Sequence, residues 1–500
     1  MDQNASRPQP DRNQKKDPPL DESELAANQE ALDRGAMLAG ARNTGGGAAV
    51  NHLSLEGMHN TVAVPHHTAG FWRQYRAFVG PALLVSVGYM DPGNWGTDLQ
   101  GGAQFKFGLL WVVALSSLMA IFLQVCSARL GVGTGRDLAQ ACRYWYPRWT
   151  RYPNWIFCEI AIGACDLAEV LGSAVAINLL FHVPILWAVI ITACDVFVLL
   201  ALQRFGMRLI EAVILVLVAT IGICYFIELF VLPQTSPNFM AMAGAMFHPG
   251  LGQLGMTTVA IGIIGATVMP HNLYLHSALV QSRKLRSDDE HKRTAIRFNT
   301  IDSTVALGIA FFVNAAILVL AATVFFGKSG VTAGGTHYQF NDDTDWIRVA
   351  FLTLAPLLGT VAASLLFAIA LLASGQSSTI TGTLAGQVVM EGFMHWRITP
   401  WVRRLITRLL AILPAIFVIG LRGAGSINDL LVLSQVVLAL QLPFAMFPLM
   451  HFTSRGKFMG KWKNGWFLLA TGWASAILIT LMDIYSLPDA IHDAWRVIHG

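Results

Sequence analysis

Apolar residues fill most of the chain from about residue 77 onward, in stretches of about 20 to 30 residues separated by short polar segments. About 20 consecutive apolar residues in a helix cross the hydrocarbon core of a bilayer. The pattern therefore predicts about eleven spans, at residues 77–102, 107–130, 154–181, 183–203, 208–232, 252–282, 299–327, 359–390, 402–421, 428–451 and 465–485. Residues 345–357 have the pattern of an amphipathic lead-in to the eighth span.

Composition agrees with this pattern. Of the 500 residues, 54% are hydrophobic and only 13% are charged, whereas soluble domains contain about 25% charged residues. We therefore predict an all-α polytopic membrane protein. Residues 1–70 lack a sustained apolar run and are predicted to form a mostly disordered cytoplasmic tail. A solvated tail is favoured over a metal-collecting one, because its histidines have no fixed spacing: His52, His59, His66 and His67.

The charges of the loops predict the orientation. Lys and Arg cluster in the loops after spans two, six and ten, whereas residues 233–250 contain neither. Because positive loops stay in the cytoplasm, we expect a cytoplasmic amino terminus. An odd number of spans then places the carboxy terminus on the periplasmic side.

A short motif occurs twice. Asp91-Pro92-Gly93-Asn94 in the first span is matched by Met269-Pro270-His271-Asn272 in the sixth. Five spans run from one motif to the next, so the two five-span units insert with opposite topology. This predicts the leucine-transporter type of 5+5 inverted repeat, with a transporter domain at 75–485. Within it we expect a first repeat at about 77–232, a second at about 252–451 and an extra helix at about 465–485.

Proline and glycine in the two motifs predict broken helices 1 and 6. Carbonyls freed inside a membrane must be buried in protein, line a cavity or bind a ligand. Asp91 offers a charge, Asn94 an amide oxygen and Met269 a sulfur, and the unwound backbone near Gly88 or Ala266 offers carbonyls. Asp91 alone could be a helix cap, and Met269 alone could be packing. Together they predict a cation site.

The ligand types indicate the class of metal. Mg²⁺ and Ca²⁺ prefer shells made only of oxygen, whereas a thioether favours Mn²⁺, Fe²⁺ and the later transition metals. Met269 therefore favours a transition metal, without choosing between Mn²⁺ and Fe²⁺.

The third span carries an acidic stripe. Asp166 and Glu169 are three residues apart and so share a helix face, and Glu159 lies two turns earlier on about the same side. Such a stripe is typical of a proton pathway. The alternative is a structural ion-pair network with Arg404 and Arg408 of the ninth span, and the two interpretations are compatible.

Further polar residues accompany the second motif. His271 is a candidate metal ligand, proton station or packed polar residue, and for His276 we expect packing. Three more side chains are candidates to line the route or to bond neighbouring helices: Gln124, Thr267 and Asn314.

The two motifs, the following Leu273-Tyr274-Leu275-His276 and the segment Ala373-Ser374-Gly375-Gln376-Ser377-Ser378 resemble the Nramp family of proton-coupled divalent-metal transporters, in its bacterial manganese-transporting branch. The resemblance implies metal binding by Asp91, Asn94, Met269 and the Ala266 carbonyl, and a tenth-span glutamine, here Gln435, that joins when the site closes. It also favours His271 as a pH-sensitive station.

From this we expect proton-coupled import of Mn²⁺ and Fe²⁺ across the bacterial inner membrane by alternating access. Its partners are metal ions, protons and the bilayer; no nucleic acid, obligatory protein partner or bound cofactor is expected. The alternatives are a metal sensor without transport, a magnesium-transporting relative, which would lack Met269, and a sodium-coupled amino-acid transporter, whose substrate carboxylate Asp91 would repel. No nucleophile and base stand together, so we do not expect an enzyme.

Overall fold

The computed structural model describes residues 54–55, 58–66, 68–193, 207–231, 238–253, 255–285, 288–333, 336–340, 344–358, 361–396, 398, 400–422 and 427–499. Most of the predicted tail, with His52 and His67, lies outside the described residues, as does the second half of the fourth predicted span.

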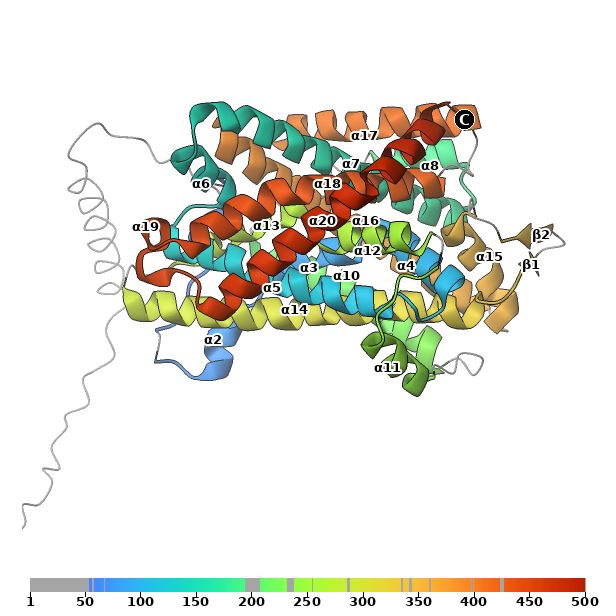
Figure 1. The fold of residues 1–500 in the computed structure, drawn as a ribbon, viewed down its shortest axis with the longest axis horizontal. Coiled ribbons are helices and arrows are strands. Elements are labelled where there is room, and N and C mark those ends of the chain that lie inside the picture. Colours follow the sequence, from blue (N-terminus) through green and yellow to red (C-terminus); the bar gives the residue numbers. More distant parts are fainter. Residues whose placement is uncertain are drawn as a thin grey trace, which may run out of the picture. The chain divides into compact units, whose positions relative to one another are not determined.

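The described residues are mainly helical (Figure 1). The elements in chain order are α2 (Phe71–Phe78), α3 (Pro81–Ser86), η2 (Val87–Met90), α4 (Pro92–Phe105), α5 (Leu110–Thr134), α6 (Leu138–Trp145), η3 (Arg148–Thr150), α7 (Arg151–Phe181), α8 (Ile185–Thr192), α10 (Met207–Phe226), η4 (Ile227–Val231), α11 (Phe239–Phe247), α12 (Met256–Thr267), α13 (Pro270–Leu279), η5 (Val280–Ser282), α14 (Asp289–Val324), β1 (Gly330–Ala333), β2 (Thr336–Gln339), α15 (Trp346–Leu358), α16 (Val361–Met394), α17 (Pro400–Arg422), α18 (Ile427–Ser454), α19 (Gly456–Met459), η7 (Gly460–Trp462) and α20 (Trp466–His499).

Within the described ranges, eight helices are long and apolar enough to cross a membrane, and two shorter apolar helices occupy Pro81–Met90 and Leu405–Leu421. These correspond to predicted spans, and α8 begins the fourth. The first and sixth spans are each interrupted at the predicted proline: α4 begins at Pro92 and α13 at Pro270. The prediction of an all-α membrane fold with two broken helices is confirmed.

Two features outside the spans were not predicted. β1 and β2 form an antiparallel hairpin between α14 and α15, with Val331 opposite Tyr338. In addition, Val62, in the last part of the predicted tail, pairs in parallel with Arg283 after η5. The Val62 amide donates to the Ser282 carbonyl (3.0 Å), and the Lys284 amide donates to the Val62 carbonyl (2.8 Å). Backbone pairing of this kind needs no apolar pattern, so no pattern of residues indicated it.

Long helices hold the two breaks between them. α16 packs along α7, α14 packs along α4 and α5, and α18 contacts α7, α12 and α4. In Figure 1 the yellow α14 runs along one side of these helices and the red α20 crosses α5 and α18, both of which it contacts. Trp95, one residue after the first motif, is fully buried and contacts the rings of Tyr225 on α10 and Phe367 on α16. The first break is therefore fixed against two neighbouring helices.

Candidate metal site at the two helix breaks

The first break is built around Asp91, which is completely buried. Its backbone is extended (φ −69°, ψ 167°), and Pro92 opens α4, a position where proline loses no helical hydrogen bond. The Asp91 Oδ1 atom accepts from the Asn94 amide at 2.9 Å, which makes Asp91 the N-cap. The other oxygen, Oδ2, has no hydrogen-bond partner among the described residues. One oxygen therefore caps the helix and the other remains available to a ligand.

The prolines also explain which carbonyls are freed. In a helix the carbonyl of residue i accepts from the amide of residue i+4, and proline has no N–H. Gly88 precedes Pro92 by four residues and Ala266 precedes Pro270 by four. Both predicted carbonyls thus lose their helical donor because of the proline in the motif that follows them.

Asn94 joins the two breaks. Its Nδ2 donates to Asp91 Oδ1 (2.8 Å) and to the Ala266 carbonyl (3.1 Å). Its Oδ1 accepts from Asn314 Nδ2 (3.3 Å), which also donates to the Tyr89 carbonyl (2.8 Å). The side-chain amide of Asn94 therefore bridges the carboxylate of the first break and the backbone of the second.

Met269 is the N-cap residue of α13 and is completely buried. It forms a small apolar cluster with Ala161 and Cys165 of α7 and Leu438 of α18. Met269 therefore packs against α7 and α18 at the second helix break.

Two side-chain amides lie against glycines of the first break. A Cβ at Gly88 would overlap the Asn272 amide, and a Cβ at Gly93 would overlap the Gln435 amide. Gln435 is completely buried, and its Oε1 has no hydrogen-bond partner in the described part of the chain. Gln435 thus lies beside the break that contains Asp91.

The acidic stripe meets Arg408 of α17. The Arg408 guanidinium lies 3.8 Å from the Asp166 carboxylate and 3.7 Å from that of Glu169, and it donates to Thr379 Oγ1 on α16 (2.8 Å). Ser378 Oγ donates to Glu169 Oε1 at 2.9 Å. All three charged residues are buried. Asp166 and Glu169 are therefore part of one ion-paired cluster, which is compatible with either predicted role.

Glu159 has a partner that was not among the candidates. Its carboxylate pairs with Arg403 at 3.0 Å, whereas the side chain of Arg404 lies outside the described residues. The four-residue spacing of Arg404 and Arg408 suggested one shared face. However, neighbouring residues on a helix point about 100° apart, and a long arginine side chain spans much of that difference.

The histidines of α13 differ in their surroundings. His271 is buried, and its Nδ1 has no hydrogen-bond partner among the described residues. His276 Nδ1 is 2.9 Å from Gln124 Oε1, and Gln124 Nε2 donates to the Tyr89 hydroxyl (2.7 Å). Thr267 bonds within its own helix, to the Ile263 carbonyl. His276 and Gln124 thus link helices, as expected.

The site is not a cluster of the usual strong metal ligands. Across the described ranges, no group of three or more His, Cys, Asp or Glu residues is placed to hold a metal ion. A cation at the breaks would instead be held by one carboxylate together with amide, carbonyl and thioether groups.

The comparisons with known proteins identify the family. Residues 82–489 match the model of the Nramp family, described as natural resistance-associated macrophage protein-like. The chain belongs to the Nramp family. It is 50% identical over 441 residues to the divalent metal cation transporter MntH of Nostoc sp., covering 87% of this chain and 96% of that one. It is 49% identical to the MntH of Mesorhizobium japonicum, covering 88% and 94%.

Solved structures agree with this assignment to the Nramp family. The Eremococcus coleocola manganese transporter, in complex with an aromatic bis-isothiourea substituted compound, superposes with a TM-score of 0.79 at 39% identity, covering 88% of this chain and 91% of that one. Mhp1, a nucleobase-cation-symport-1 family transporter, superposes with a TM-score of 0.51 at 13% identity, covering 84% and 92%. At that identity Mhp1 supports the fold alone.

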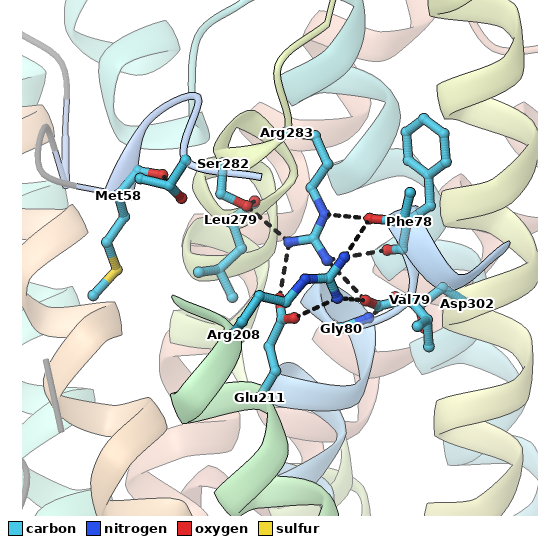
Figure 2. A network of polar contacts seen from close by, with 12 residues as sticks. Met58, Phe78, Val79, Gly80, Arg208, Glu211, Leu279, Ser282, Arg283 and Asp302 are labelled. Carbon is cyan, nitrogen blue, oxygen red and sulfur yellow. Dashed lines mark hydrogen bonds and ion pairs between the residues drawn. The ribbon is translucent and has the colours of Figure 1, made fainter. Parts of the chain in front are cut away.

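The Nramp fold here also contains a charged network that the sequence analysis missed (Figure 2). It surrounds the junction of α2 and α3. Helix α3 is the half-helix that leads to the first break. Asp302 of α14 accepts from the amides of Gly80 (3.3 Å) and Ala82 (2.9 Å). Gly80 has φ +137°, and a Cβ there would overlap the Glu211 carboxylate, so this position requires glycine.

Two arginines donate hydrogen bonds to backbone carbonyls on the α2 side of this junction. Arg283 donates to the carbonyls of Ala77, Phe78 and Val79, and Arg208 donates to those of Arg76, Ala77 and Val79. Glu211 pairs with both arginines at 2.9 Å. Burial lowers the pKa of the Arg283 guanidinium, and the neighbouring Glu211 acts in the opposite direction. We call Arg208, Glu211, Arg283 and Asp302 the junction clamp. In the sequence, the Gly80-Pro81 pair is the feature that indicates a turn at this junction.

Proposed function

We propose that this protein imports divalent transition-metal ions, Mn²⁺ and Fe²⁺, together with protons across the bacterial inner membrane by alternating access. The observation that carries the proposal is the Asp91 carboxylate. It is completely buried among membrane helices, and its Oδ2 has no hydrogen-bond partner in the described structure. A buried charge is strongly unfavourable unless it is paired or bound, and a divalent cation supplies that pairing.

The surrounding groups supply the rest of a coordination shell. The Ala266 carbonyl lies within hydrogen-bond distance of Asn94 Nδ2, which also contacts Asp91. Rotation of the Asn94 carboxamide by half a turn exchanges its N–H groups for its oxygen. An arriving cation then takes over the two acceptors, with Met269 and Gln435 completing the shell. The thioether favours a transition metal over Mg²⁺ or Ca²⁺.

Proton coupling is proposed for the buried residues beyond the metal site. Asp166 and Glu169 both lie close to Arg408, at 3.8 and 3.7 Å. A shared cation can balance one carboxylate while the other accepts a proton. His271 follows the second break directly. We assign His271 the role of a pH-sensitive station near the metal site.

The relatives support transport over the alternatives. Proteins about 50% identical over nearly their whole length are named divalent metal cation transporters, and the superposed Eremococcus coleocola structure is a manganese transporter. We extend that role to this chain, with the amino terminus in the cytoplasm and the carboxy terminus in the periplasm. A sensor without transport would bind metal but would not accumulate it.

The test is metal binding and uptake by the Asp91→Asn variant. Asparagine can still accept from the Asn94 amide, so the cap is retained while the charge is lost. We expect Mn²⁺ binding, measured by calorimetry on monodisperse protein, and uptake into proteoliposomes to be nearly abolished. Asp483→Asn, which removes a buried carboxyl from α20, is the matched control and should bind Mn²⁺ normally. Normal affinity in Asp91→Asn would remove Asp91 from the site.

A further inference from the structure

A second carboxyl group is buried in the same half-helix as Asp91. Asp98 lies on α4, seven residues after Asp91, and is only 1% exposed. Seven residues are close to two helical turns, so the two side chains lie on the same face of α4, about 10 Å apart along its axis. At this separation the charge at one residue acts on the other, and the two interact electrostatically.

Asp98 has no partner that would balance a negative charge. Among the described residues, neither of its carboxyl oxygens has a hydrogen-bond partner, and no Lys, Arg or His forms an ion pair with it. Asp166 and Glu169 differ in this respect, because both lie close to Arg408. An unpaired carboxylate in the interior of a membrane protein is strongly unfavourable unless it binds a cation or a proton.

The surroundings of Asp98 favour a proton over a metal ion. Asp91 lies at the helix break, beside an amide and the freed carbonyl of Ala266. Asp98 instead lies inside the continuous part of α4, where backbone carbonyls accept helical hydrogen bonds. The rest of a coordination shell is therefore missing at Asp98, whereas a proton needs no shell.

The other groups near Asp98 come from α10 and the π-helical turn η4. Trp95, one turn before Asp98, contacts the ring of Tyr225, with the ring centroids 5.1 Å apart. The Tyr225 hydroxyl is buried, has no hydrogen-bond partner in the described part of the chain, and interacts electrostatically with both Asp98 and Glu228. Glu228 is itself completely buried. Neither Tyr225 nor Glu228 can supply positive charge to Asp98.

We propose that Asp98 is a proton-binding residue of the transport cycle, which holds a proton while the site at Asp91 is empty and releases it when a divalent cation binds there. The inference rests on the proposed function, because it requires a cation at Asp91. Such a cation makes the start of α4 more positive, which favours the carboxylate form of Asp98. The O–H bond of the carboxyl group then breaks and the proton leaves. By linkage, a proton on Asp98 weakens metal binding at Asp91 to the same extent.

The test compares the unmodified protein with Asp98→Asn, whose carboxamide has the size of the carboxyl group but cannot release a proton. Mn²⁺ affinity of the full chain in detergent is measured by calorimetry from acidic to alkaline pH. At acidic pH the two proteins should bind Mn²⁺ equally, because residue 98 is neutral in both. As the pH rises, the unmodified protein should gain affinity relative to the variant, by up to about tenfold for each pH unit over which Asp98 loses its proton. Asp98→Ser, a smaller neutral side chain, should show the same pH dependence as Asp98→Asn.

Asp483→Asn is the matched control, because it removes another buried carboxyl, on α20, and it should follow the unmodified protein at every pH. Titrations in two buffers of different ionisation enthalpy count the protons released per Mn²⁺. This number should fall in Asp98→Asn and stay unchanged in Asp483→Asn. An affinity ratio between Asp98→Asn and the unmodified protein that is the same at every pH would overturn the inference, as would an unchanged proton count. Failure of the unmodified protein to bind Mn²⁺ would instead contradict the proposed function, and this inference with it.

Discussion

Asn94 is the residue that ties the two halves of the candidate site together. It donates to a side chain of the first break and to a backbone carbonyl of the second, so the separation of the two breaks is fixed by one carboxamide. A substitution at this position would change both the ligand set and the spacing between the half-helices.

The first prediction at the scale of single residues concerns Met269. Met269→Ala removes the thioether that we propose as a ligand and leaves room for water, which makes a harder oxygen shell. We expect Cd²⁺ binding to weaken by roughly tenfold or more, Mn²⁺ binding to weaken less, and Ca²⁺ and Mg²⁺ to compete better for uptake. The measurement is uptake into proteoliposomes with competing cations.

Met269→Leu is the control for packing, because it nearly conserves volume within the cluster of Ala161, Cys165 and Leu438. If the sulfur sets selectivity, the leucine variant loses discrimination against Ca²⁺ and Mg²⁺ while folding normally. Full discrimination in Met269→Leu would show that the sulfur is not a selectivity element.

Glu169 gives a prediction on coupling. Glu169→Gln keeps an oxygen that can accept from Ser378 Oγ but removes the charge shared with Arg408. We expect Mn²⁺ affinity to stay within about threefold, because the carboxylate at the break is untouched, whereas proton entry per metal ion falls. Internal pH and metal entry would be followed together in the same liposomes. Unchanged proton flux would leave Glu169 as a structural ion-pair partner.

The residues at the breaks could be predicted from the sequence because proline and glycine act locally. Each proline lacks the N–H group that the carbonyl four residues earlier would accept from in a regular helix. The sequence could not identify partners across helices. Arg403, which the spacing did not single out, pairs with Glu159, and this contact depends on how α17 is rotated against α7. Such rotation depends on packing between distant segments, about which a local pattern of residues carries almost no information.

At the scale of elements, the junction of α2 and α3 depends on one glycine. Gly80→Ala would put a Cβ into the Glu211 carboxylate and would also strain a backbone at φ +137°. We expect a loss of roughly 1–3 kcal/mol of stability, seen as a lower midpoint of thermal unfolding in detergent. The variant should also loosen α3, because the amides of Gly80 and Ala82 would move from Asp302.

Gly70→Ala is the matched substitution. Gly70 precedes α2, has φ −56°, and has open space around its Cβ position. It should leave the unfolding midpoint within about 1 °C of the unmodified protein, since unstrained surface changes have little effect. A similar drop in both variants would mean that the junction clamp does not determine the effect of residue 80.

At the scale of the whole molecule, the segment around Val62 is paired through backbone hydrogen bonds with the loop that follows the sixth span. Val62→Pro removes the amide that donates to the Ser282 carbonyl and should release this segment, which limited proteolysis would detect as faster cleavage near residue 62. Ala63→Pro is the control, because the described structure gives no hydrogen bond to its amide. Equal cleavage of the two variants would argue against a role for the pairing.

Gly93 and His271 occupy equivalent positions in the two breaks. Gly93 has no side chain and leaves space beside the backbone, whereas the imidazole of His271 fills the corresponding space. Gln435 lies in the space beside Gly93, while His271 is itself buried in the second break. Two identical halves would give outward-open and inward-open states that are related by symmetry and equal in free energy. In the alternating-access mechanism proposed above, differences between the halves, such as the one at this pair of positions, make the free energies of the two states unequal. The two states would then be unequally populated before any ion binds or any gradient is applied.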